Sequence, residues 1–332
     1  MKEHSLWQFI RDRLTAGERV MLLTVVDHEK GSPGKSGFKL AFTSDQKCVG
    51  TIGGGIMEHS MIGTYSGRLR SDENICEIRY MVHSPKAKHG EPSGLSCAGS
   101  QTMCALSLGK KDLPAVTAID EAVVRHTASK MIITEKGIAY SGGRNSNHQQ
   151  FQSSGLSEWI YEENIGPEFT VCIIGGGHVG NALSRIMATL DFHVVLYDDR
   201  HDLPMVMDNF FADKKIIAPF SEIGSTIFNA EKTLAAIVTS NALSDAVALQ
   251  QLLPLPLLYI GIMGVEAKIE RIKNSLNETE KELLAKQRIF TPIGLEIGSA
   301  TAEEIAVSIA AQLIKVKNES PMLRDIKTTV KK

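Results

Sequence analysis

The glycine-rich segment VCIIGGGHVG, residues 171–180, constrains the fold of this chain more than any other stretch. An apolar strand runs directly into a glycine turn and then into a helical pattern, and Gly175, Gly177 and Gly180 have the spacing G-x-G-x-x-G. The first glycine of such a turn permits the bend, the second lets the backbone approach a pyrophosphate, and the third lets the helix lie close to the strand. The motif therefore predicts a dinucleotide whose phosphates bind at a helix N-terminus.

An acidic residue follows the next strand, where a dinucleotide site binds the ribose. The segment LYDDR places Asp198 at the end of that strand, about 20 residues after the glycines, where it is expected to accept a hydrogen bond from the 2′-hydroxyl. A carboxylate there favours NAD over NADP, and Arg200 weakens that preference. His178, inside the turn, either donates to a phosphate or faces solvent. The alternative is a structural domain with a vestigial site.

Strands alternate with helices after residue 168, which predicts an α/β fold, a Rossmann-like doubly wound parallel sheet with helices on both faces. The preceding half contains an amphipathic helix and strand-like segments with glycine-rich connections, which indicate a mixed α+β domain. A polar stretch poor in aliphatic residues separates the halves. We expect an α+β domain at 1–145, a linker at 146–167, a Rossmann-like domain at 168–316 and a polar tail at 317–332.

The composition is that of an ordinary globular protein. The 332 residues carry a formal net charge of −2, with 43% hydrophobic and 22% charged residues, so nothing points to nucleic acid or to an acidic membrane. The longest apolar run, at 252–265, is too short for a bilayer, and the first residues lack the apolar core of a secretory signal. We expect a cytoplasmic protein.

The five cysteines form an odd set without a C-x-x-C pair, which argues against disulfides and against a zinc ribbon. Cys97 lies in a glycine-containing loop. The other four lie in strand-like apolar segments and are expected to be small core residues: Cys48, Cys76, Cys104 and Cys172.

Three further glycine clusters occur in the amino-terminal half: KGSPGKSGFKLAF at 30–42, VGTIGGGIMEHS at 49–60 and GLSCAGS at 94–100. Each cluster alone is consistent with ordinary turns that bind nothing. Together they place backbone amides, Ser32, Lys35 and a thiol on loops, and consecutive amides in glycine-rich turns form anion-binding nests. We therefore consider a second anion site in this half.

These clusters, with VCIIGGGHVGNAL, LYDDR, YIGIMG and TPIGLEIGSATAEEIAVSIAAQLI, give the chain a resemblance to the XdhC/CoxI family. Members of that family are accessory proteins that mature molybdenum hydroxylases such as xanthine dehydrogenase. The resemblance runs in the same order over residues 5 to 315. Its most specific part is PIGLEIG followed by EEIAVSIAAQ, which ordinary dinucleotide enzymes do not share.

The resemblance implies a homodimeric protein that binds molybdenum cofactor, protects its sulfurated form and passes it to an apo molybdenum hydroxylase, with a cysteine desulfurase as a further partner. Its glycine-rich loop and acid match four residues here: Gly53, Gly54, Gly55 and Glu58. Cys97 matches the cysteine of the family's Cys-Gly-Gly stretch, and a thiolate is a soft ligand suited to a contact with molybdenum. Ala98 replaces the first glycine of that stretch, and TSNALSD stands where many members carry a Thr-Arg-Gly-His segment.

Each of these residues also has a structural interpretation. Cys97 is equally well a thiol without a ligand, since its reactivity depends on a local pKa. Glu58 is favourably placed as an acid in the first turn of a helix, and Lys35 is an ordinary residue of a solvated turn.

The leading hypothesis is a cofactor chaperone without turnover of its own. The first alternative is an NAD(P)-dependent oxidoreductase, in which the amino-terminal half supplies the missing acid or base, Glu58 or Lys35, because the strand ends of the other half offer none. The second alternative is an interaction protein that senses a nucleotide.

Overall fold

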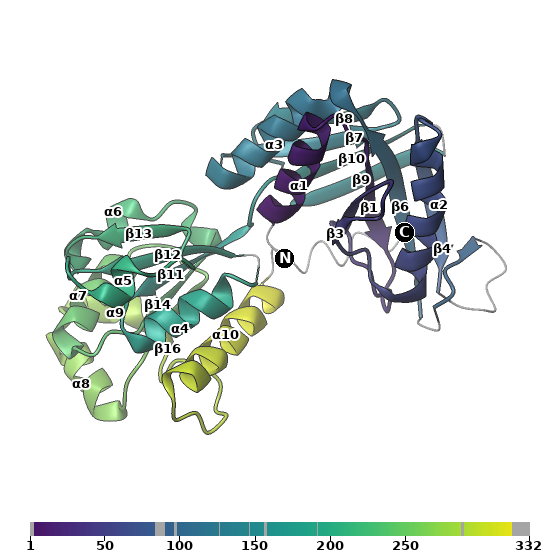
Figure 1. Cartoon of the computed structure of the whole chain (residues 1–332). Helices are drawn as coiled ribbons and strands as arrows, with labels where there is room; N and C mark the ends of the chain where they lie inside the picture. The colour runs from purple at the N-terminus through teal and green to yellow at the C-terminus, as the bar shows by residue number, and fades with distance from the viewer. Residues whose placement is uncertain are drawn as a thin grey trace. The chain divides into compact units, whose positions relative to one another are not determined.

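The computed structural model describes residues 3–83, 90–95, 98–125, 127–145, 147–155, 158–190, 192–286 and 289–320 (Figure 1). The chain divides into two compact units, Met1–Gly166 and Pro167–Lys332. Each unit builds its own hydrophobic cores. In the part of the chain that is described, no helix is both long and apolar enough to span a membrane.

The first unit combines helices with a six-stranded and a four-stranded sheet. Its α-helices and strands are, in chain order, α1 Glu3–Thr15, β1 Val20–His28, β2 Lys39–Thr43, β3 Cys48–Gly50, α2 Gly55–Arg70, β4 Cys76–Val82, β5 Glu91–Pro92, β6 Ser100–Leu108, α3 Leu113–Arg125, β7 Ser129–Thr134, β8 Gly137–Gly142, β9 Gln149–Gly155 and β10 Glu158–Asn164.

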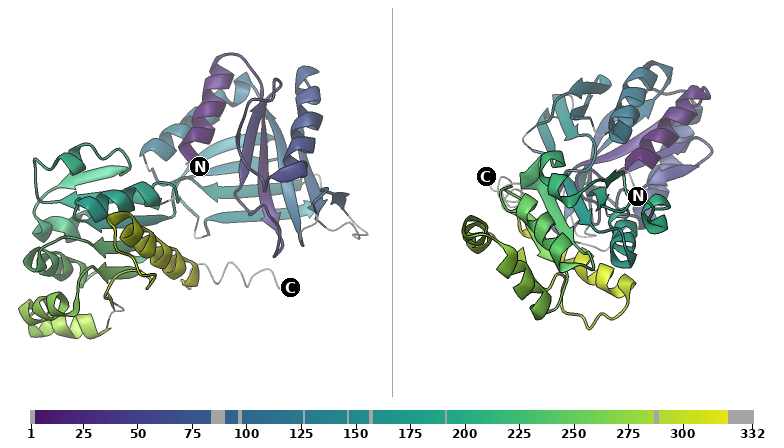
Figure 2. Two further views of the ribbon diagram at one scale, coloured as in Figure 1. Left: turned by 60° about the horizontal axis from the view of Figure 1, so that its bottom comes forward. Right: turned by 90° about the vertical axis from the view of Figure 1, so that its left-hand side faces the viewer.

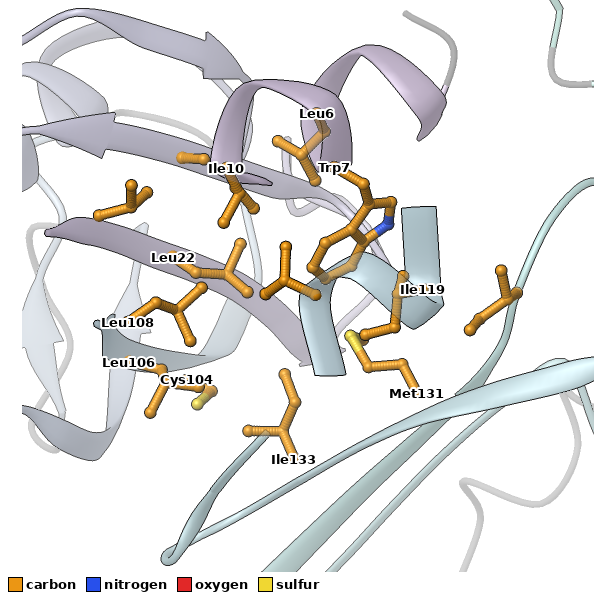
Figure 3. Close-up of a cluster of buried hydrophobic side chains, with 14 of the residues drawn as sticks. Leu6, Trp7, Ile10, Leu22, Cys104, Leu106, Leu108, Ile119, Met131 and Ile133 are labelled. Atoms are coloured by element: carbon orange, nitrogen blue, oxygen red, sulfur yellow. The ribbon is translucent and has the colours of Figure 1, made fainter. Parts of the chain in front are cut away.

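The six-stranded sheet, in the order β3-β2-β1-β6-β4-β5, is covered on both faces. In β1, Val20 and Leu22 point into a core shared with α1, α3 and the four-stranded sheet, whereas Met21 and Leu23 point into a core with α2. The period of two residues explains this division. Figure 3 shows the first of these cores, with side chains of α1, β1, β6, α3 and β7 gathered between the elements.

Residues 146–167 were predicted as a linker, but they contain β9 and β10, the last two strands of the sheet β8-β7-β10-β9. The prediction failed because β9 is an edge strand with a largely exposed, polar sequence, which resembles a linker in composition. In β10, Trp159 and Tyr161 are buried and anchor the hairpin in the core.

A buried ion pair joins the two sheets of this unit. The Lys39 ammonium of β2 lies 2.7 Å from the Glu163 carboxylate of β10, and both side chains are less than a tenth exposed, at 6% and 7%. The Tyr161 hydroxyl donates to the same carboxylate at 2.8 Å. Each of these two buried charges therefore compensates the other.

The second unit is the predicted Rossmann-like domain, and its parallel sheet has the order β13-β12-β11-β14-β15-β16. Its α-helices and strands are β11 Phe169–Ile174, α4 His178–Met187, β12 Phe192–Asp198, α5 Pro204–Met207, β13 Lys214–Ile217, α6 Ile223–Thr226, β14 Thr233–Ile237, α7 Ala242–Leu252, β15 Tyr259–Ile262, α8 Glu266–Ser275, α9 Glu278–Lys286, β16 Ile289–Phe290 and α10 Ala302–Glu319. The strand order is 3-2-1-4-5-6, that of dinucleotide-binding domains.

Helices cover both faces of this sheet, as the sequence predicts (Figure 2). Helices α4 and α10 pack on one face, and α7 and α8 pack on the other. The predicted capping box of Thr301 and Glu304 opens α10. The helix continues to Glu319, so the prediction of a polar tail from residue 317 was wrong. The Lys317 ammonium lies over the rings of Phe169 and Phe192 and so holds the last turn of the helix on the domain. Residues 321–332 lie outside the described part.

Substitution Glu163→Gln should destabilise the first unit by about 3 kcal/mol, because it removes the carboxylate that pairs with the buried Lys39 ammonium. The free energy of unfolding from urea denaturation measures this. The control is Glu135→Gln, which removes an exposed carboxylate 3.9 Å from Lys136 and should change stability by less than about 0.5 kcal/mol. Equal effects of the two substitutions would contradict this account of the ion pair.

Candidate functional site

The glycine turn lies where the strand order reverses, between the carboxyl ends of β11 and β14. Gly175 has a φ of +107°, and a Cβ there would lie 3.0 Å from the Thr239 backbone nitrogen. A Cβ on Gly180 would lie 1.9 Å from the Gly175 carbonyl oxygen, so α4 touches the turn with its backbone. An added Cβ on Gly177, the N-cap of α4, would meet no atom within 4 Å. The second glycine therefore leaves open space beside the helix N-terminus, and His178 after it is exposed.

Asp198 ends β12 and is fully buried, with its carboxylate facing the glycine turn. It accepts hydrogen bonds from the Gly176 amide at 2.7 Å and from the Arg200 side chain at 2.7 and 2.8 Å. Burial alone would raise the pKa of Asp198, but the hydrogen bonds from Arg200 and the backbone hold it below its usual value. The carboxylate predicted for a ribose is thus engaged within the protein.

A buried polar cluster lies beside this turn and was not predicted from the sequence. The Asp245 carboxylate of α7 accepts a hydrogen bond from the Thr239 hydroxyl and lies 2.5 Å from the Lys268 ammonium of α8. Lys268 also donates to the carbonyl oxygens of Thr239 and Met263 at 2.9 and 3.0 Å. The cluster joins the ends of β14 and β15 to two helices. No sequence signal indicates it, since Asp245 and Lys268 lie in separate helices.

The three amino-terminal glycine clusters meet at one edge of the six-stranded sheet. Because β1, β2, β3, β4 and β6 are antiparallel to their neighbours, the connections after β1, β3 and β4 leave the sheet at the same edge. A Cβ on Gly34 would lie 2.3 Å from the Ile52 carbonyl oxygen, one on Gly31 would lie 3.1 Å from Ala98, and one on Gly55 would lie 3.2 Å from Leu95. The loops are therefore in direct contact.

Glu58 organises the glycine loop before α2. Its Oε1 accepts hydrogen bonds from the amides of Ile52 at 2.8 Å and Gly54 at 2.6 Å, and from the Thr51 hydroxyl. The Gly53 amide donates to the same hydroxyl at 3.1 Å. Gly53, Gly54 and Gly55 all have positive φ values, of 124°, 81° and 71°. The amides of this loop thus converge on an anion, and a carboxylate of the chain occupies part of that place.

A second buried network lies beneath the loops. The Ser32 hydroxyl donates to Gln101 Oε1 at 3.0 Å and is 3.0 Å from His83 Nε2, whose Nδ1 is 2.8 Å from the Ser93 hydroxyl. The Gln101 amide donates to the Ile52 carbonyl oxygen at 3.1 Å, so all three loops are linked. Ser32 is only 2% exposed. Its hydroxyl therefore supports the loops from within.

Lys35 stands on the outside of the same loops. Its ammonium donates to the Ser32 carbonyl oxygen at 2.7 Å, and the residue is exposed. The charge is thus held at the edge where the glycine loops meet.

Two family models match this chain, one in each unit. The model of the XdhC and CoxI family matches residues 13–81, and the model of the XdhC Rossmann domain matches residues 171–313. The chain belongs to the XdhC/CoxI family. The resemblance found in the sequence is thereby confirmed.

Two relatives each match about half of this XdhC/CoxI chain. The uncharacterized protein YqeB of Escherichia coli K12 is 27% identical over 50% of the chain, and a Bacillus subtilis protein named as a probable subunit of xanthine dehydrogenase is 27% identical over 48%. The matches span 30% and 46% of those two relatives, less than half of their length. A crystal structure described as a xanthine dehydrogenase from Bacillus halodurans covers 98% of this chain, and the chain covers 99% of it, with a TM-score of 0.72 and 21% identity, which supports the fold.

The segment PIGLEIG packs against helix α10. The Gly294 amide donates to Gln312 Oε1 of α10 at 2.9 Å, and the Gln312 amide returns a bond to the Gly294 carbonyl oxygen at 3.0 Å. A Cβ on Gly294 would lie 2.3 Å from the Ser308 hydroxyl. The segment and α10 are therefore interlocked.

Cys97, the predicted molybdenum contact, lies outside the described residues. Cys104 and Cys172 are buried as expected, and burial raises the pKa of the Cys172 thiol to about 12. Burial also raises the pKa of the half-buried Cys76 to about 11. The expectation for Cys48 was wrong, because β3 is a three-residue edge strand that leaves its thiol exposed. In the described ranges, no group of three or more potential metal-binding side chains gathers.

Substitution Gly180→Ala should destabilise the second unit by about 1–3 kcal/mol, because its Cβ would drive α4 away from the turn. The matched control Gly177→Ala adds the same methyl group into open space at a φ of −71°, and should cost less than about 0.5 kcal/mol. Thermal unfolding followed by circular dichroism measures both. The account of the turn is wrong if the control is the more damaging substitution.

His83 should make the amino-terminal loops sensitive to acid. Burial lowers the pKa of His83, against a smaller opposing effect of the bond with Gln101. The pKa of His83 is therefore lower in the folded state than its unfolded value of about 6.5. Such a group contributes stability above about pH 6.5, and this stability is lost as the pH falls through the folded pKa. The destabilisation caused by His83→Gln should therefore shrink between about pH 7.5 and about pH 5.5. Urea denaturation at both pH values measures it, with exposed His59→Gln as the control. An unchanged difference between the two pH values would remove this role.

Proposed function

We propose that this protein binds the molybdenum cofactor in its first unit and delivers the sulfurated form to a molybdenum hydroxylase such as xanthine dehydrogenase. The observation that carries the proposal is the meeting of three glycine-rich loops at one edge of the six-stranded sheet. Membership of the XdhC/CoxI family supports it, as does the name of the Bacillus subtilis relative, which refers to xanthine dehydrogenase. A homodimer and a cysteine desulfurase partner belong to the same proposal.

The donor set of this edge suits the anionic end of such a cofactor. The amides of Gly55, Ile56 and Met57 open α2 and therefore have no acceptor within the helix. An added Cβ on Gly54 would meet no atom within 4 Å, so the backbone there is open to a ligand. The Lys35 ammonium adds a positive charge. A terminal phosphate would find both amide donors and a cation in this place.

The remaining predicted residues take supporting parts in this proposal. Ser32 positions the loops through His83 and Gln101, and Glu58 holds the amides of Ile52 and Gly54 in place. When bound, the cofactor would supply the molybdenum centre and its sulfido group. The protein binds and orients it, and Cys97 is the proposed thiolate contact near the metal.

Two variants test the site in the full chain, Lys35→Ala and Cys97→Ala. The protein is mixed anaerobically with molybdenum cofactor released from a hydroxylase, and molybdenum per chain is measured after gel filtration. Loss of one charge-assisted contact with phosphate should weaken binding about tenfold for Lys35→Ala. For Cys97→Ala, we expect a lower recovery of activity when the loaded protein is mixed with apo-hydroxylase.

The controls remove the same chemical groups elsewhere in the first unit. Lys47→Ala removes an exposed ammonium from the turn between β2 and β3, at the opposite edge of the sheet, and Cys48→Ala removes an exposed thiol. Neither should alter binding or delivery. Wild-type protein that takes up no molybdenum, or test variants that behave as their controls do, would overturn the proposal for this site.

A dinucleotide site in the second unit is the second candidate function. The strand order and the glycine turn at the switch point favour it. Asp245 and Lys268, the charged pair at this place, are occupied by each other and by strand ends, so we favour nucleotide sensing over hydride transfer. Binding of NADH or NADPH without turnover would support sensing, and steady turnover would support the oxidoreductase instead.

A further inference from the structure

We propose that Arg200 makes the nucleotide site of the second unit select a ribose that carries a 2′-phosphate, so that NADP binds in preference to NAD. The proposal rests on the dinucleotide binding proposed for this unit. It reverses the preference that the sequence alone predicts from Asp198.

Asp198 has no acceptor position left for a ribose hydroxyl. Its Oδ1 accepts from the Arg200 amide at 3.0 Å and from Arg200 Nε at 2.7 Å. Its Oδ2 accepts from the Gly176 amide at 2.7 Å and from Arg200 Nη2 at 2.8 Å. A carboxylate offers about four lone-pair positions, and all are used. A 2′-hydroxyl would have to displace one of these donors before it could bind.

Arg200, in contrast, presents hydrogen-bond donors to solvent at the end of β12. The Asp198 side chain is fully buried, whereas the Arg200 side chain is 53% exposed. Two hydrogen bonds to one carboxylate fix the plane of the guanidinium, so its remaining N–H donors have a set direction. Nη1 has no hydrogen bond within the described residues, so this end of the fork remains available to an anion. An incoming ribose would therefore meet the Arg200 guanidinium, which Asp198 holds in place.

The glycine turn and Arg200 are parts of one structure. Gly176 is bonded to Asp198, and a Cβ on Gly176 would lie 2.2 Å from Val206, so the turn and the segment after β12 pack tightly together. A dinucleotide with its pyrophosphate at the N-terminus of α4 would bring its adenosine ribose towards the end of β12. That is the position of Arg200.

Neighbouring carboxylates limit the size of the preference. Asp199 and Asp202 are exposed in the same loop, and Asp199 interacts electrostatically with Arg200. Both would repel a phosphate, but they are solvated and screened, whereas the Arg200 contact is direct. We therefore expect a preference of about tenfold, which one charge-assisted hydrogen bond can supply.

The test compares nucleotides that differ only in the 2′-phosphate. The full chain is titrated at low ionic strength with NADPH and NADH by fluorescence, and by calorimetry with 2′-phospho-ADP-ribose and ADP-ribose, which lack the nicotinamide. The phosphorylated member of each pair should bind about tenfold more tightly. The preference should decline as salt is added, because it depends on charge.

Variants then assign the preference to the side chain. Arg200→Ala should abolish it, and Arg200→Lys, which keeps the charge without the fork, should retain only part of it. The control Arg185→Ala removes the same group from the last turn of α4, far along the helix from the glycine turn, and should keep the full preference. Melting curves establish that each variant is folded. The titrations of the wild-type protein show by themselves whether a preference exists. The proposal can therefore be tested even if Arg200→Ala does not fold.

The outcomes separate this inference from the function on which it rests. If the wild type binds none of the four nucleotides, dinucleotide binding itself fails. If NADH binds as tightly as NADPH or more tightly, the site exists but Arg200 does not select for phosphate. A preference that survives in folded Arg200→Ala would likewise overturn the assignment.

Discussion

Direct contact between backbone segments at glycine residues is the constraint on which both candidate sites depend. In the second unit, the third glycine of the turn brings α4 against the carbonyl oxygen of Gly175, where an added Cβ would lie at 1.9 Å. In the first unit, Gly34 and Gly53 bring the loops after β1 and β3 together, with Cβ positions 2.3 Å and 2.7 Å from backbone atoms. Any side chain at these points would separate the segments whose amides line the candidate sites.

The two units share a second device, in which a carboxylate of the chain holds the amides of its own glycine loop. Glu58 binds the amides of Ile52 and Gly54, and Asp198 binds the amide of Gly176. An internal anion stabilises such a loop before a ligand arrives and so lowers the ordering cost of binding. The same hydrogen bonds leave those amides and that carboxylate unable to contact a ligand directly. In both proposals, the groups that would bind a ligand are the first amides of the following helix and a nearby cation, Lys35 in one unit and Arg200 in the other.

Two polar clusters of the second unit have structural roles. Gly294, Ser308 and Gln312 interlock the PIGLEIG segment with α10. Asp245 and Lys268 tie the ends of β14 and β15 to their helices. Both clusters are engaged within the protein, so a ligand would contact the glycine loops rather than these side chains.

The sequence by itself determined the elements that depend on local periodicity and on glycine spacing: the parallel sheet with helices on both faces, the turn at Gly175, Gly177 and Gly180, and the capping box at Thr301. Each is encoded within a few consecutive residues, where backbone sterics and hydrogen bonding decide the conformation. Only the tertiary structure decided the partners of polar groups. Asp198 is satisfied by Arg200, Ser32 by His83, and the polar strand β9 is in a sheet because β10 pairs with it. A polar side chain contacts whichever partner the fold brings near, and that partner is often far away in the sequence.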